Sequence, residues 1–210
     1  MAHSHHKESF YARGIARIYD SFMRNREATV LGPRRAYLLR PLRGKVLEIG
    51  AGTGVNFQYY HPETSVLAIE PSLAMLEKAR QKATENIRLL HAGLGDPEFE
   101  QQLEAGSLDA IVCTLVLCTV PDPQAAFVQF VHWLKPGGRL ILLEHIVSHH
   151  PFKARLQSLF TPFWKMMAEG CHLNRPTDKW IAETHLQKVE EEYFQMGVSW
   201  YQAVYLKKRK

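Results

Sequence analysis

Three glycines two positions apart follow a short apolar run near residue 50. They are Gly50, Gly52 and Gly54, within the segment 46–56. Because glycine has no Cβ, the backbone N–H groups of such a turn can approach a ligand closely. Glu70 ends the next apolar run, where a carboxylate can accept hydrogen bonds from both hydroxyls of a ribose. The spacing predicts a turn that binds an adenosine-containing cofactor, with a plain tight turn as the alternative.

The residues around the turn disfavour a dinucleotide. Val55 stands where the third glycine of the G-x-G-x-x-G pattern would be, which leaves less provision for a pyrophosphate. Glu48, just before the turn, would repel a doubly anionic ligand and suits an amine-bearing one. An NAD-dependent oxidoreductase is therefore disfavoured.

His145 is the candidate for acid–base chemistry. It follows Glu144 at the end of the apolar run 139–146. An imidazole there can take a proton from a nucleophile such as a thiol, whose reference pKa of about 8.5 leaves little thiolate at neutral pH. Neighbouring strand residues face opposite sides, so only one of Glu144 and His145 can point into a given pocket. A hydrogen-bonded histidine without a catalytic role is the equal alternative.

These residues fall among alternating strand and helix patterns. Continuous apolar runs predict strands at 46–49, 65–69, 87–91, 108–115 and 139–146, and amphipathic patterns predict helices at 72–83, 97–104 and 124–134. A terminal β-hairpin is predicted at 186–194 and 199–207. We expect an α/β fold with a doubly wound, mostly parallel sheet, which binds its ligand beyond the carboxyl ends of the strands.

Two further helical segments are predicted. Residues 1–40 would form an N-terminal helical cap of the same domain, which could cover the ligand edge of the sheet. Residues 152–167 carry aromatic and aliphatic side chains at helical spacing, beside three basic ones. Burial of this second helix against the sheet or an acceptor pocket is preferred over a lid or weak contact with a membrane surface.

The net charge of +5 does not indicate a nucleic-acid partner. The basic tail at 207–210 carries +4 of it, so the rest of the chain is nearly neutral. No apolar stretch approaches the roughly 20 residues that a membrane span needs, and the N-terminus lacks the apolar region of a secretory signal. Because three cysteines are too few for a disulfide framework, a reducing compartment and cytoplasmic localisation are expected.

No metal is expected from the spacing of possible ligands. The N-terminal histidines and the pair His149 and His150 have no cysteine or carboxylate partner at a ligand spacing. No CxxC pair is present. Cys113 and Cys118 are expected on opposite faces of one strand, each as a small buried hydrophobic residue.

Several of these segments together resemble the class I S-adenosylmethionine-dependent methyltransferases. They are 46–56, the Glu-Pro pair at 70–71, the strand at 112–120, and the Leu-Lys-Pro-Gly-Gly-Arg-Leu run at 134–140. The Cys-Thr-Leu-Val-Leu-Cys run at 113–118, the Glu-His pair at 144–145 and residues 170–177 are similar to the methyltransferase-like family that includes the mammalian thiol S-methyltransferases. The resemblance implies S-adenosylmethionine as cofactor and a methyltransferase domain at 41–207. It also implies a seven-stranded sheet of order 3-2-1-4-5-7-6, with the last strand antiparallel and helices on both faces.

The resemblance assigns parts of the cofactor to particular positions. The glycine turn would contact the methionine part, Glu48 its amino group and Glu70 the ribose, while the loop after the third strand would receive the adenine. The cofactor-binding residues implied in this way are Tyr19, Glu48, Gly50, Ala51, Gly52, Gly54, Asn56, Glu70, Pro71, Gly93, Leu94, Cys113 and Thr114. Tyr19 lies in a segment that resembles the entry segment of quinone methyltransferases, with helix packing as its alternative. Cys113 and Thr114 would line the channel to the acceptor.

The acceptor side is implied to involve Tyr11, His145, Cys171 and Arg175, with a surface ion pair as the alternative for Arg175. We expect methyl transfer to a small, fairly apolar acceptor, with a thiol as first choice. Methylation of a quinone carbon or of a phospholipid-headgroup nitrogen is the enzymatic alternative, and a cofactor-binding module without turnover is the non-enzymatic one. The sequence leaves the attacking atom and the oligomeric state open.

Overall fold

The computed structural model describes residues 26–168 and 170–209. The predicted N-terminal cap is described only from residue 26, as the π-helix η1 (Glu27–Leu31) and the helix α2 (Gly32–Leu39). Tyr11 and Tyr19, together with the N-terminal histidines, lie outside the described residues, so their predicted roles stay predictions.

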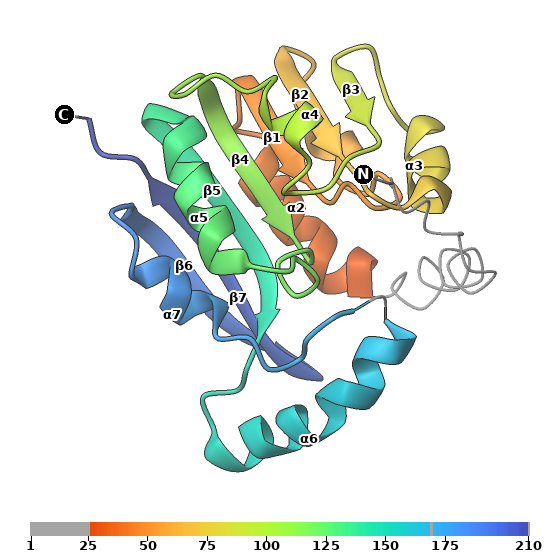
Figure 1. Ribbon diagram of the computed structural model, residues 1–210, viewed down its shortest axis with the longest axis vertical. Coiled ribbons are helices and arrows are strands. Elements are labelled where there is room, and N and C mark those ends of the chain that lie inside the picture. The colour runs from red at the N-terminus through yellow and green to blue at the C-terminus, as the bar shows by residue number, and fades with distance from the viewer. Residues whose placement is uncertain (1–25, 169, 210) are drawn as a thin grey trace.

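Seven strands form one sheet in the order β3-β2-β1-β4-β5-β7-β6 (Figure 1). They are β1 (Gly44–Ile49), β2 (Thr64–Ile69), β3 (Ile87–Leu90), β4 (Leu108–Thr114), β5 (Leu134–Ile146), β6 (Gln187–Met196) and β7 (Val198–Leu206). The first five strands pair in parallel, whereas β7 pairs antiparallel with both β5 and β6. The predicted α/β class, the strand order and the terminal hairpin are confirmed.

Helices cover both faces of the sheet, as expected for crossover connections between parallel strands. On one face α4 (Pro97–Glu100), α5 (Pro123–Trp133) and α7 (Thr177–Ala182) contribute Phe99, Phe127 and Ile181 to one core cluster. On the other face α2, the short 3-10 helix η2 (Phe57–Tyr59) and α3 (Leu73–Arg80) contribute to a second cluster. Three of the strand-to-helix turns end in capping side chains, such as Asp122, whose carboxylate accepts from the Ala125 N–H at 3.0 Å.

Several predicted boundaries differ from the structure. The helix expected at 72–83 ends at Arg80, and the strand expected at 139–146 begins at Leu134. The helix expected at 97–104 ends at Glu100. The strand expected to reach residue 115 ends at Thr114, because Leu115 adopts φ +59° and turns the chain out of the sheet.

The helix α6 (Pro151–Met167) projects beyond the sheet at the bottom of Figure 1. Its buried residues are the polar Gln157 and Thr161, whereas Leu159 is 73% exposed and Met166 84% exposed. The prediction that its apolar side chains are buried against the sheet was therefore wrong. The periodicity correctly predicted a helix, but it could not show which part of the molecule the apolar side chains contact. Among the described residues, no helix has the length and apolar character needed to cross a bilayer.

Candidate functional site

The glycine turn follows β1 at the carboxyl edge of the sheet and is held in the left-handed region of backbone conformations. Gly50 has φ +67° and Gly52 has φ +57°. A Cβ on Gly50 would lie 2.3 Å from the Val116 side chain, so the turn packs directly against the loop that follows β4. A Cβ on Gly52 would meet nothing within 4 Å. The turn thus has one packed side and one side that borders open space, where a ligand can approach the backbone.

Glu70 lies at the end of β2 and braces this turn. One of its carboxylate oxygens accepts from the Gly52 N–H at 2.8 Å, and the other accepts from the Ser72 N–H at 2.9 Å. A carboxylate oxygen has a second lone pair, so these bonds leave capacity to accept from ribose hydroxyls. The structure places Glu70 beside the glycine turn, as the sequence predicted.

The loops after β2 and β3 meet on the side predicted for adenine. A Cβ on Gly93 would lie 3.7 Å from the side chain of Pro71, and the Nε2 of His91 lies 2.9 Å from the Pro71 carbonyl oxygen. Leu94 is partly buried against the core. Pro71, Gly93 and Leu94 therefore lie close together, as their assignment to one subsite requires.

A buried polar network lies behind the glycine turn, between β1, α2 and the end of β4. The carboxylate of Glu48 accepts from the Asn56 amide and from the Tyr60 hydroxyl, each at 2.9 Å. Arg35 donates to the Asn56 carbonyl oxygen at 2.7 Å and to the Thr114 hydroxyl at 2.8 Å. Burial raises the pKa of Glu48 to about 7, against the opposing effect of its two hydrogen-bond donors and the charge of Arg35.

The sequence predicted three members of this network and missed Arg35 and Tyr60. Glu48, Asn56 and Thr114 lie together as expected, but their polar groups form hydrogen bonds with one another and with Arg35. Arg35 is buried on the same helical stripe as Leu38 and Leu39. An arginine on an apolar stripe is the sequence signal that could have identified it, since a buried guanidinium must be paired.

Cys113 does not line a channel in this structure. Its side chain has no exposed surface and packs in a core cluster, and burial raises the pKa of its thiol well above the usual value. The prediction that Cys113 lines the channel was therefore wrong, whereas the expectation that it is a small buried hydrophobic residue is confirmed. The alternation of β4 turns it to the face covered by α5, whereas the next residue, Thr114, faces Asn56 and Arg35.

At the end of β5, His145 meets two thiols. Its Nε2 lies 3.2 Å from the Cys171 sulfur. The sulfur of Cys118 is also close, so all three donor atoms lie within 4.8 Å of one another. Cys118 was expected on the opposite face of a strand from Cys113. That was wrong, because the strand ends before it and Cys118 lies in the following turn. The resemblance assigned His145 and Cys171 to the acceptor side, where the structure brings them together, but it did not include Cys118, which is more than 25 residues from either.

The three groups shift one another's pKa values in opposite directions. The hydrogen bond from Cys118 and the contact with His145 lower the pKa of Cys171 to about 4, although burial opposes the shift. The pKa of Cys118 is raised well above its usual value by the same hydrogen bond and by burial. Burial lowers the pKa of His145, but the Cys171 hydrogen bond and the nearby negative charges outweigh it, so the net direction is upward.

Hydrogen bonds to backbone carbonyl oxygens hold the two cysteine loops together. The guanidinium of Arg175 donates to the carbonyls of Leu117 and Val120. The N–H and the Nδ1 of His172 lie 3.0 and 3.1 Å from the Cys118 carbonyl oxygen. Arg175 is buried, so the predicted surface ion pair is wrong and its donors serve the loop rather than an open acceptor pocket. It acts as a positioning residue for Cys118.

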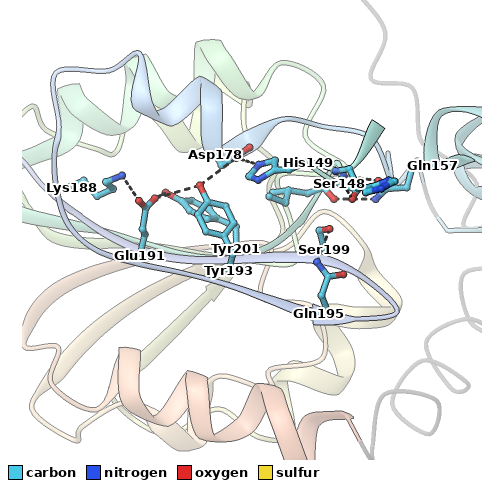
Figure 2. A network of polar contacts seen from close by, with 12 residues as sticks. Ser148, His149, Gln157, Asp178, Lys188, Glu191, Tyr193, Gln195, Ser199 and Tyr201 are labelled. Carbon is cyan, nitrogen blue, oxygen red and sulfur yellow. Dashed lines mark hydrogen bonds and ion pairs between the residues drawn. The ribbon is translucent and has the colours of Figure 1, made fainter. Parts of the chain in front are cut away.

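A second set of contacts fixes the segment between β5 and α6 (Figure 2). Gln157 accepts from the Ser148 N–H at 2.7 Å and donates to the carbonyls of Ile146 and Leu173. His149 is half exposed, and its Nε2 lies 2.7 Å from the carboxylate of the buried Asp178. Figure 2 shows this contact continuing through tyrosines of the hairpin. The start of α6 is thereby tied both to the hairpin and to the loop that carries Cys171.

The fold and this edge of the sheet define the class of the protein. The family description "Methyltransferase domain" matches residues 47–142, which include the glycine turn, Glu70 and the end of β4. A methyltransferase from Thermotoga maritima superposes with a TM-score of 0.65 at 19% identity, covering 94% of this chain and 99% of that one. An O-methyltransferase family protein from Burkholderia thailandensis superposes with a TM-score of 0.69 at 13% identity, covering 94% and 60%. Residues 47–142 therefore match the methyltransferase domain family, and the described residues share the fold of these solved methyltransferases.

Within that class the chain resembles the TMT1 proteins. It is 35% identical over 158 residues to the rat thiol S-methyltransferase TMT1B and 30% identical over 158 residues to the human thiol S-methyltransferase TMT1A, in each case over 74% of this chain and 65% of the relative. A phosphatidylethanolamine N-methyltransferase from Cereibacter sphaeroides is 25% identical over 70% of this chain and 72% of that protein. The chain thus spans slightly less than two thirds of the length of the TMT1 relatives it matches.

Proposed function

We propose that this protein transfers the methyl group of S-adenosylmethionine to the sulfur of a small, fairly apolar thiol. The observation that carries the proposal is His145 at the carboxyl end of β5, buried and 3.2 Å from a sulfur atom. The loop that precedes Cys118 packs on the glycine turn through Val116, which puts the histidine's surroundings next to the cofactor-binding edge. The printed activity of the TMT1 relatives supports the same chemistry.

Methyl transfer from a sulfonium is a displacement at carbon that needs an aligned, ionised nucleophile. Positioning alone can supply about 7–11 kcal/mol of such a barrier. A thiol near its usual pKa is mostly protonated at neutral pH, so a basic or positively charged neighbour assists its ionisation. An imidazole at this edge provides that assistance.

The acceptor preference follows from α6. Trp164 of that helix lies near enough to Cys171 to help lower the pKa of its thiol, so the exposed apolar surface of α6 approaches the thiol and histidine group. An apolar acceptor can therefore approach the group along a surface of its own polarity.

A direct assay tests the proposal. Purified protein and methyl-labelled S-adenosylmethionine are incubated with alkyl and aryl thiols, with a quinone, and with phosphatidylethanolamine. We expect label in thioethers only and a steep loss of rate in His145→Ala. The matched control His132→Ala changes an exposed histidine on α5 and should keep the rate. Transfer to none of the thiols refutes the proposal, and tight binding of S-adenosylhomocysteine without any turnover would identify a cofactor-binding module instead.

We propose in addition that α6 makes weak contact with a membrane surface from the cytoplasmic side. Its exposed Leu159, Phe160 and Phe163 lie between the basic residues Lys153 and Arg155 on one side and Lys165 on the other, a composition suited to an anionic lipid interface. Co-sedimentation with phosphatidylserine-containing vesicles should fall for Phe160→Asp and stay unchanged for Val128→Asp, which alters an exposed apolar residue on α5. Equal sedimentation of both variants and the parent protein contradicts the proposal.

A further inference from the structure

Two thiols and one imidazole, from three segments distant in sequence, converge at the end of β5. The sulfurs of Cys118 and Cys171 and a ring nitrogen of His145 all lie within 4.8 Å of one another. Cys118 and His145 are buried, and Cys171 is partly exposed. Thiolate sulfur and imidazole nitrogen are the donors that zinc prefers, and sites with three protein ligands keep the fourth position open for substrate.

The separations of these atoms suit one bound ion. With zinc–sulfur bonds of about 2.3 Å and zinc–nitrogen bonds of about 2.0 Å, a tetrahedral ion places its sulfur ligands about 3.8 Å apart. A sulfur and a nitrogen ligand are then about 3.5 Å apart. The distance of 3.2 Å between His145 Nε2 and Cys171 Sγ needs a change of only a few tenths of an ångström. The other two separations are at most 4.8 Å, so neither exceeds its ideal value by more than about 1.3 Å.

The protein groups around His145 do not compensate its burial well. His145 is only 7% exposed. Its Nδ1 has no hydrogen-bond partner among the described residues. The partner of its Nε2 is the sulfur of Cys171, a weak hydrogen-bonding group. A metal ion bound at Nε2 would replace this weak contact with a stronger bond, whereas the surroundings of Nδ1 would stay as they are.

The loops that carry the ligands are fixed before any ion binds. Arg175 holds the carbonyls on either side of Cys118, and His172 holds the carbonyl of Cys118 itself. Gln157 connects the end of β5 to the carbonyl of Leu173, two residues after Cys171. Because these contacts restrict both loops, the three donors lose little conformational freedom on binding an ion.

We propose that Cys118, His145 and Cys171 bind one zinc ion, and that its fourth position takes the acceptor thiol. The second half rests on the proposed thiol methylation. The acceptor gives up its proton to water and binds through its sulfur as a thiolate. That sulfur then forms a bond to the methyl carbon while the bond between this carbon and the sulfonium sulfur breaks. The products are a neutral thioether and S-adenosylhomocysteine, and the thioether, a weaker ligand than a thiolate, leaves.

Metal binding is tested on the purified full chain, reduced and stripped with a chelator. Titration with Co²⁺ should give one equivalent of tetrahedral visible bands with thiolate-to-cobalt charge-transfer absorption. Zn²⁺ should displace the cobalt. Affinity from competition with a chromogenic chelator should fall at least about 100-fold in Cys118→Ser, Cys171→Ser and His145→Gln. Cys113→Ala removes a thiol outside the group and should bind one equivalent with unchanged affinity.

The acceptor half has its own spectroscopic test. Adding an alkyl thiol to the cobalt protein should shift the charge-transfer band, and the corresponding methyl thioether should not. Failure to bind one equivalent, or binding that the three ligand variants leave intact, overturns the proposal. The isolated protein could contain a Cys118–Cys171 disulfide. If reduction of that disulfide gives a protein that binds no zinc, the proposal is also overturned.

The two proposals fail in distinguishable ways. If the stripped protein methylates thiols at the full rate and binds no cobalt, thiol methylation stands and the zinc site is wrong. If cobalt binds at one equivalent but no thiol shifts its spectrum or becomes methylated, the metal site stands and the proposed function is wrong. Thermal unfolding of each serine variant without metal shows whether it folds.

Discussion

Replacing Glu70 with glutamine should separate cofactor binding from folding. The present carboxylate accepts from the Gly52 and Ser72 N–H groups at 2.8 and 2.9 Å. A glutamine keeps one acceptor and turns an NH₂ donor toward the other N–H, so the turn must rearrange. It also loses an ionised acceptor for the ribose, where a hydrogen bond to a charged group contributes about 1.5–3 kcal/mol. With about 1 kcal/mol for the rearranged turn, the loss is about 2.5–4 kcal/mol, or roughly 70- to 900-fold in affinity.

Isothermal titration with S-adenosylhomocysteine measures this change in Kd directly. Differential scanning fluorimetry without ligand should show a much smaller effect, because the bonds lost lie at a partly exposed loop. Glu77→Gln, on the exposed face of α3, is the matched control and should leave both quantities unchanged. A Glu70→Gln protein with the parent Kd would refute the placement of the ribose at this carboxylate.

Three further predictions follow from single contacts. Gly52→Ala should cost about 1–2 kcal/mol of stability because Gly52 has a positive φ. It should weaken S-adenosylhomocysteine binding by more, because the added Cβ enters the open side of the turn. Isothermal titration and thermal unfolding measure the two effects. Burial raises the pKa of Glu48 to about 7, above its value in the unfolded chain. Between about pH 4.5 and 7 the folded protein therefore binds one proton more than the unfolded chain, and its stability should fall as the pH rises through that window. Urea unfolding at several pH values should show this slope, and Glu48→Gln should reduce it; an unchanged slope excludes Glu48 as the source. Gln157→Leu leaves its buried partners unsatisfied and should cost about 2–4 kcal/mol, with faster hydrogen exchange at 170–176; unchanged exchange would show that Gln157 does not hold this loop.

The sequence predicted the central features of the fold because they are local. Continuous apolar runs mark strands that are buried on both faces, and each of the five parallel strands lies where such a run predicted it. The glycine turn and Glu70 were also predictable, because a positive φ and a carboxylate at a strand end leave a mark within a short window. The strand order came from the resemblance to methyltransferases and is confirmed.

Only the tertiary structure decided which distant groups share an environment. Arg35 contacts residues 21 and 79 positions away, and no local period records such a contact. The same holds for His145 and Cys171, which are 26 residues apart, and for Cys118, whose position depends on the end of β4 at Thr114. The burial of α6 was mispredicted because a helical period shows that apolar side chains share a stripe but not what the stripe contacts. Sequence determines local conformation through short-range sterics and burial pattern, whereas chemistry between loops depends on how packed elements bring them together.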